Sequence, residues 1–185
     1  MRVRYQIHFE QELPAGALCR FLNESYGISP DVVYVGRVED RAVDDPRPVA
    51  MLSPPPHDEE FGWTLTGDTD LADATGQGER ELAITLARAF GMRALVDDGS
   101  IYPSRWLLVS TDGSSGRVII DEDAAADGHL RVVHALEPIS AEPHLAVTPP
   151  PSGQVTGFRL EKATPAHHRR RPAFSWRGPP VWQPR

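Results

Sequence analysis

The sequence contains one cysteine, one lysine and no long apolar segment among its 185 residues. A single cysteine, Cys19, cannot form an intramolecular disulfide, which excludes a disulfide-rich secreted domain and favours a cytoplasmic location. No window approaches the ~20 apolar residues that a membrane helix needs, and the alternating N-terminal segment does not have the composition of a signal peptide. We therefore expect a soluble, unprocessed protein with no membrane association.

The sequence also lacks the short motifs of common active sites. It has no G-x-S-x-G elbow, no H-E-x-x-H, no C-x-x-C and no phosphate-binding lysine motif. Gly76 and Gly78 precede a predicted helix, but the dinucleotide-binding pattern requires a third glycine where Glu81 stands. Glu79 and Glu81 would repel a bound phosphate and instead suit the helix dipole. These observations predict no catalytic residue and no cofactor.

Two acidic segments could suggest a metal site. Residues 57–60 place a histidine beside three acids, but contiguous side chains do not converge on one ion. Residues 121–128 resemble a calcium loop only superficially, because the glycine comes too late and no closing glutamate follows. We interpret both segments as solvated acidic turns and predict no metal.

Charge divides the chain into two parts. Residues 1–140 contain 12 basic and 24 acidic residues, whereas residues 141–185 contain seven basic and two acidic ones. An acidic domain repels nucleic-acid phosphates and favours cationic partners. The domain boundary is therefore predicted at residue 140, with an acidic globular domain before it.

Hydrophobic periodicity predicts a single α+β domain. The most regular patterning lies in residues 79–123, which read as a helix followed by strands. We predict a mostly antiparallel sheet of about six to eight strands with two helices packed on one face. The predicted helices are 13–26 and 79–90, and the predicted strands are 2–10, 31–38, 49–52, 61–66, 94–96, 105–111, 116–121 and 130–136.

Local patterns give more specific expectations. Segment 31–38 is apolar on both faces, which favours a central strand. Alternation in the first strand places His8 on its polar side, which we interpret as a solvated face. Segment 67–73 reads as an acidic connection, and Cys19 lies within a helical pattern with no base nearby, which indicates a structural role.

The C-terminal segment 141–185 is rich in proline and arginine and is predicted to be largely disordered, apart from a possible strand at 156–161. Its arginines alternate with aromatic residues, a pattern that suits single-stranded nucleic acid. The same segment is compatible with folding back on the acidic domain, with docking in a partner as a proline-rich peptide, and with having no specific ligand.

Three functional hypotheses follow. The first is a non-enzymatic binding protein that docks or neutralises a basic protein partner, as an immunity protein or antitoxin-like inhibitor does. The second is a small enzyme with an acidic cleft near 97–104 and 112–116, assembled from separated residues such as Ser110 and His134. The third is nucleic-acid association through the tail. The predicted partner-binding residues are Asp97, Asp98, Asp112, Asp121, Glu122, Asp123, Arg169, Arg170, Arg171, Trp176 and Trp182.

Overall fold

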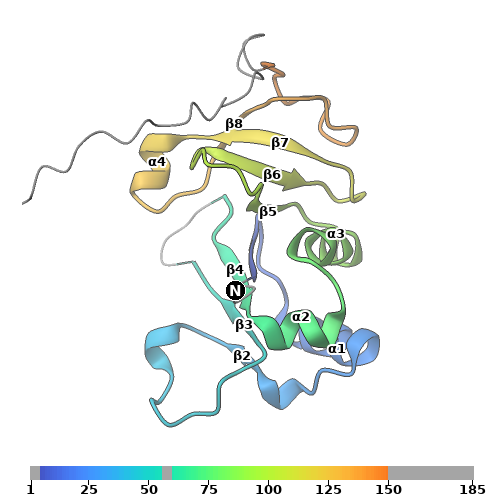
Figure 1. The fold of residues 1–185 in the computed structure, drawn as a ribbon, viewed down its shortest axis with the longest axis vertical. Helices are drawn as coiled ribbons and strands as arrows, with labels where there is room; N and C mark the ends of the chain where they lie inside the picture. Colours follow the sequence, from blue (N-terminus) through green and yellow to red (C-terminus); the bar gives the residue numbers. More distant parts are fainter. Residues whose placement is uncertain (1–4, 56–59, 150–185) are drawn as a thin grey trace, which may run out of the picture. The chain divides into compact units, whose positions relative to one another are not determined.

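A computed structural model describes residues 5–55 and 60–149 (Figure 1). These residues belong to one compact unit, Met1–Pro150. The predictions made for residues 57–59 of the acidic segment, for the possible strand 156–161 and for the arginines and tryptophans of the tail lie outside the described residues. The predicted disorder of the tail also lies outside them from residue 150 onward, whereas residues 141–149 are described.

The unit is built on one eight-stranded sheet, which confirms the predicted α+β class. The strand order is β2-β3-β4-β1-β5-β6-β7-β8, and every neighbouring pair is antiparallel except β2 and β3. The strands are β1 (Tyr5–Phe9), β2 (Val33–Val35), β3 (Ala50–Ser53), β4 (Trp63–Gly67), β5 (Ala94–Asp97), β6 (Arg105–Val109), β7 (Ser115–Ile120) and β8 (Val132–Ala135).

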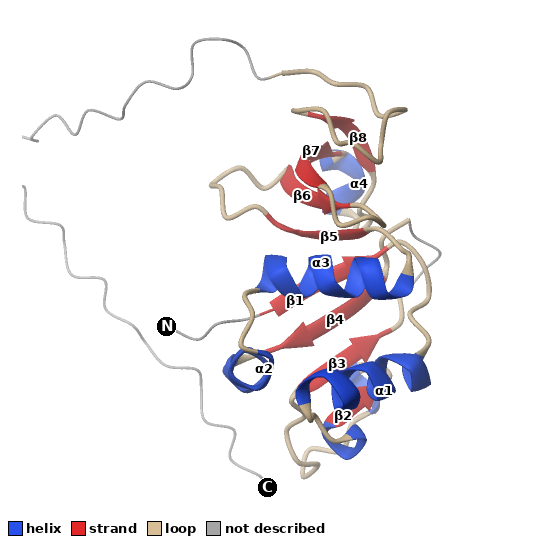
Figure 2. Cartoon of the chain, turned by 90° about the vertical axis from the view of Figure 1, so that its right-hand side faces the viewer, coloured by secondary structure: helices blue, strands red, loops and turns tan. Residues whose placement is uncertain are grey.

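The helices cover the two faces of the sheet unequally. Helices α1 (Ala15–Tyr26), α2 (Thr69–Thr75) and α3 (Glu79–Phe90) pack on one side, here called the helical face (Figures 1 and 2). The short helix α4 (Glu122–Ala126) packs on the opposite side, the second face. Two 3₁₀ turns, η1 (Pro30–Val32) and η2 (Val38–Asp40), flank β2.

Each face has its own hydrophobic core, and the two cores are offset along the sheet. On the helical face the core extends from β2 to β6 and includes Tyr5 and Ile7. On the second face it extends from β5 to β8 and includes Leu95 and Val118. The second face therefore has no apolar core over β2, β3, β4 and β1, and the helical face has none over β7 and β8.

In each of the two predicted helices, the apolar periodicity stops where a glycine can end the helix, so both signals mark the same segment. The predicted helix 79–90 matches α3, and both α1 and α3 end at glycines in the left-handed conformation, Gly27 at φ 69° and Gly91 at φ 63°. Glycine adopts this conformation without the penalty that other residues meet. Both helices pack on the same face, as predicted.

Helices α2 and α4 were not predicted, because their segments were interpreted as an acidic connection and an acidic turn. Both are short, and short helices depend on tertiary contacts rather than on propensity. Leu71 of α2 is fully buried in the core of the helical face. Helix α4 begins at Asp121, whose carboxylate accepts hydrogen bonds from the backbone N–H groups of Asp123 and Ala124.

The prediction of a central strand at 31–38 is wrong. Strand β2 contains only three residues, lies at the edge of the sheet and pairs with β3 alone. Val35 and Val38 are 41% and 58% exposed. Apolar side chains on both faces do not require burial on both faces, and this segment leaves several of them at the surface.

The chain after residue 140 remains attached to the sheet. Val147 forms a parallel bridge with Ala135, and Ile139 is buried in the core of the second face. Glu142 is only 6% exposed and accepts a hydrogen bond from Ser110 at 2.8 Å. Residues 139–148 thus form part of the unit that carries the sheet.

Arg93 forms the ion pairs that anchor this segment. Its guanidinium lies 2.6 Å from Glu10, 3.3 Å from Glu60 and 3.7 Å from Glu142, measured between nitrogen and oxygen. It also lies over the ring of Phe61, 5.4 Å from the centroid. Glu10 follows β1 and Glu60 precedes β4, so a single cation joins three segments that are distant in sequence.

Removing the guanidinium of Arg93 is expected to lower the stability of the domain. In the Arg93→Met variant, Glu142 keeps its charge in a buried position without its cation, and the free energy of unfolding should fall by about 3 kcal/mol. Urea denaturation measures the loss. The exposed Arg20→Met serves as a control and should change stability by less than about 0.5 kcal/mol.

The Arg93→Met/Glu142→Gln double variant separates charge from packing. It should be more stable than Arg93→Met alone, because the amide can still accept from Ser110 without leaving an unpaired buried charge. Equal losses in Arg93→Met and Arg20→Met would contradict the role of Arg93.

Candidate functional site

The predicted carboxylates at the end of β5 differ in their accessibility. Asp97 is exposed, and its Oδ1 accepts the backbone N–H of Gly99 at 2.8 Å. The side chain of Asp98 is only 3% exposed and lies 3.9 Å from Arg105 and 3.7 Å from Arg117. Asp97 is therefore available to a partner, whereas Asp98 is engaged within the domain.

The other predicted carboxylates cap turns. Asp112 lies at the tip of the β6–β7 hairpin, where hydrogen bonding from Ser114 lowers its pKa. Asp121 has a lowered pKa because it accepts from the backbone of Ala124 and from Arg131. Glu122 and Asp123 are exposed in the first turn of α4. The structure thus groups Asp121 with its two neighbours and leaves Asp112 separate.

A cluster of carboxylates that sequence reasoning did not assemble surrounds Tyr5. Burial raises the pKa of Tyr5, and the charges of Glu79, Glu81 and Asp73 raise it further. Tyr5 donates its hydroxyl hydrogen bond to the carbonyl of Gln77, at the start of α3. We call Asp73, Glu79, Glu81 and Asp97 the carboxylate cluster.

Glu79 is the most perturbed member of this cluster. Burial raises its pKa most, a hydrogen bond from the backbone N–H of Gln6 opposes that rise, and the charge of Asp97 raises the pKa again. Glu81 accepts from the backbone N–H of Gly78 at 2.8 Å, which caps α3. Gly78 is thus the N-cap of α3, whereas Gly76 ends α2 in the left-handed conformation, at φ 64°.

Two charged hollows lie where the sheet is not covered by core. One of about 320 Å³ is lined by Arg80, Asp97, Asp98, Gly99, Leu107, Arg117 and Glu137. It adjoins the carboxylate cluster through Asp97 and is lined by residues 97–99, which belong to only one of the two segments, 97–104 and 112–116, near which an acidic cleft was hypothesised. Its two arginines make it a hollow of mixed charge.

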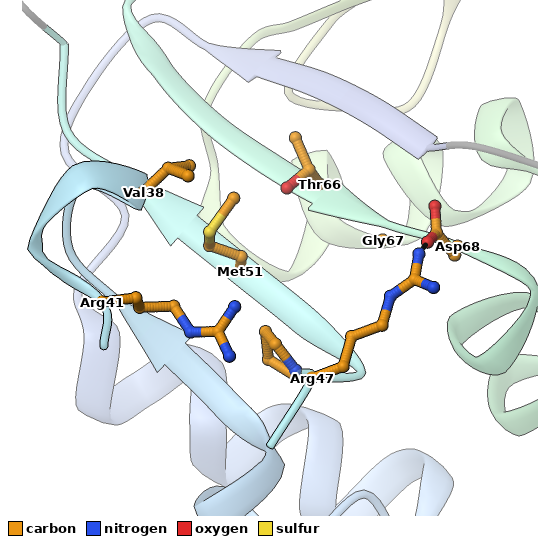
Figure 3. A pocket seen from close by; sticks show the side chains of 8 residues that line it. Val38, Arg41, Arg47, Met51, Thr66, Gly67 and Asp68 are labelled. Carbon is orange, nitrogen blue, oxygen red and sulfur yellow. Dashed lines mark ion pairs between the residues drawn. The ribbon is translucent and has the colours of Figure 1, made fainter. Parts of the chain in front are cut away.

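The second charged hollow, of about 440 Å³, lies over β3 and β4 (Figure 3). Met51 and Thr66 project from adjacent strands into it, and Arg47 reaches across to form an ion pair with Asp68. Arg41 donates to the carbonyls of Asp45 and Pro46 at 3.0 and 2.8 Å. Both arginines are held by contacts within the domain.

A third hollow, of about 280 Å³, contains His8 and corrects the prediction that this histidine is solvated. His8 is 8% exposed, and burial lowers its pKa to about 4. Its Nδ1 lies 3.1 Å from the hydroxyl of Thr64, and its ring meets that of Trp106 edge-on at 5.4 Å. The alternation of β1 was predicted correctly, but residues from β6 and α4 cover its polar side.

Of the separated residues proposed for an enzyme, His134 lies on β8, paired with Ile119 of β7, and Ser110 directly follows β6. Ser110 is fully buried and bonds to Glu142, whose other oxygen lies 3.4 Å from Nε2 of His144. In a catalytic triad the histidine lies between the serine and the acid, and here the acid takes that place. Within residues 5–55 and 60–149, no group of three or more acids, histidines or cysteines is positioned to hold a metal.

Comparison with known proteins gave no relationship: no family model, no curated protein and no solved structure matches the chain. Among the described residues, no helix has the length and apolar character needed to cross a membrane. The cytoplasmic location stays a prediction.

The raised pKa of Glu79 predicts a pH-dependent stability. The folded state holds this proton more tightly than the unfolded state, so stability contributed by Glu79 falls as pH rises through the raised value. Glu79→Gln should therefore be more stable than the wild type at pH 7, because Gln keeps the acceptor for Gln6. Below the ordinary glutamate pKa of about 4.3 the gain should vanish.

Urea unfolding at both pH values measures this difference. Glu24→Gln, at an exposed position of α1, is the control and should show no gain at either pH. A loss of stability in Glu79→Gln at pH 7 would refute the interpretation.

The lowered pKa of His8 predicts that stability falls as pH falls, the opposite of the dependence predicted for Glu79. The unfolded state binds this proton more tightly, so stability is lost as pH falls from about 6.5 toward the folded value of about 4. The pKa shift corresponds to a loss of up to roughly 3 kcal/mol. The difference in unfolding free energy between wild type and His8→Phe, measured across this range, should shrink or reverse as pH falls. A constant difference would show that His8 is not buried neutral.

Proposed function

We propose that this protein is a non-enzymatic binding protein whose acidic surface docks a basic protein partner, in the manner of an immunity protein or antitoxin-like inhibitor. The observation that carries the proposal is that carboxylates outnumber arginines in the domain and that a smaller share of them is paired. The described residues contain 23 carboxylates and ten arginines, a net charge of −13 with histidines neutral.

The arginines of the described part are almost all engaged. Nine of the ten take part in ion pairs, hydrogen bonds or ring contacts within the domain, and Arg20 is the exception among described residues. Sixteen of the 23 described carboxylates lie outside these ion pairs. The cations are thus engaged within the domain, although the side chains of Arg37 and Arg131 stay exposed, and most of the carboxylates remain outside the ion pairs.

The carboxylate cluster is the best-placed docking position. Its members come from α2, α3 and β5, so rigid elements fix their spacing. Burial is the main cause of the raised pKa of Glu79, and repulsion by the charge of Asp97 raises that pKa further. A partner's arginine or lysine would relieve this repulsion, and the surrounding negative field would speed the encounter.

Affinity capture with matched variants tests the proposal. The full chain and its Asp73→Asn/Asp97→Asn variant are used as bait in an extract of the native host, with quantitative mass spectrometry. We expect a basic protein that binds the wild type, is released by salt, and is depleted about tenfold or more with the variant.

Asp40→Asn/Asp44→Asn is the control, because it makes the same change in charge at two exposed aspartates outside the cluster. It should retain the partner nearly as well as the wild type. Capture of no protein, of an acidic protein, or of one that both variants retain equally would overturn the proposal.

A further inference from the structure

His8 presents a buried hydrogen-bonding atom that the domain does not use. Its Nε2 is inaccessible to solvent and has no hydrogen-bond partner among the described residues. An unsatisfied buried polar atom costs about 1–3 kcal/mol, and native structures rarely leave one without a reason. His8 also lines the 280 Å³ hollow between β1, β4, β6 and α4, here called the His8 pocket.

The hydrogen bonds of Thr64 define the state of the ring. The Thr64 hydroxyl lies 3.3 Å from the carbonyl of Gly62, which can only accept, and 3.1 Å from Nδ1 of His8. Both bonds form only when the hydroxyl donates to the carbonyl and Nδ1–H donates to the hydroxyl. This tautomer leaves Nε2 as a bare acceptor, because the neutral ring carries one proton.

The remaining walls of the His8 pocket are uncharged. Its lining residues are Gln6, His8, Phe61, Gly62, Thr64, Trp106, Ala125, Gly128 and Leu130. Phe61 is fully buried, and the indole N–H of Trp106 is already bonded to the carbonyl of Pro103 at 3.0 Å. An occupant therefore meets apolar and aromatic surface, the polar side chains of Gln6 and Thr64, the unpartnered Nε2 of His8 and no counter-charge for an ion.

We propose that the His8 pocket binds a small uncharged molecule that combines an apolar ring with an N–H or O–H donor, and that the His8 ring turns on binding so that Nε2, which is inaccessible in this structure, accepts from this donor. Ligand sites of this kind are mostly apolar and place a few polar groups to fix orientation. The site is distinct from the carboxylate cluster, since it lies on the second face of the sheet.

Paired probes test the hydrogen bond directly. Indole carries a ring and one N–H donor, and 1-methylindole has the same ring without the donor. Titration of the full chain, followed by isothermal calorimetry, should give indole an affinity about tenfold higher, the value of one hydrogen bond. His8→Phe should lower the affinity for indole to that for 1-methylindole.

Two further measurements keep the test independent of whether His8→Phe folds. Ala125→Leu fills the pocket without altering His8 and should weaken both probes. In the wild type, the ¹⁵N signal of Nε2 should report an unprotonated nitrogen that shifts when indole is added. No binding of either probe at millimolar concentration, equal affinity for both, or a protonated Nε2 that indole leaves unchanged would overturn the proposal.

Discussion

The ion pairs of Arg93 hold the domain together at the middle of its sheet. Arg93 immediately precedes β5, which together with β6 contributes side chains to both hydrophobic cores. Its contacts with Glu10 and Glu60 join the end of β1 to the segment before β4, and its contact with Glu142 fixes the chain beyond β8. A partly buried cation surrounded by three carboxylates requires all of these segments to be in place at once. The ion pairs of Arg93 therefore specify how these segments are arranged, even if apolar side chains in their place could give the domain equal stability.

The offset of the two cores determines where hollows occur. Apolar side chains cover β2 to β6 on the helical face and β5 to β8 on the second face. Where a face lacks its core, polar side chains such as Thr64 and Thr66 occupy the sheet surface, and loops cover it incompletely. The two charged hollows lie over these uncovered regions, and the His8 pocket lies at the border with the core of the second face, from which Phe61 and Trp106 line it. Function is accordingly expected at the margins of the cores, where the side chains are not required for packing.

The sequence allowed the main elements to be predicted, because each rests on local signals that agree. Gly27 and Gly91 end helices whose apolar faces are continuous, and the turn residues before Gly116 mark a hairpin. The short helices were missed because Leu71 and Ala125 are stabilised by distant contacts that leave no periodic pattern. The burial of His8 was missed for the same reason: alternation shows which side of a strand a residue faces, but not what covers that side. The carboxylate cluster joins three elements separated in sequence, so only the fold could assemble it.

Strand β1 separates the two proposed binding sites within one small domain. Its alternation sends Tyr5 to the helical face, beside the carboxylate cluster, and sends His8 to the second face, inside the His8 pocket. The two sites also differ in their electrostatic character. The cluster keeps exposed charges close together and attracts cations from solvent, whereas the pocket excludes charge and presents one neutral acceptor. A cationic ligand suits the carboxylate cluster and an uncharged one suits the His8 pocket, so the two ligands would not compete for one site.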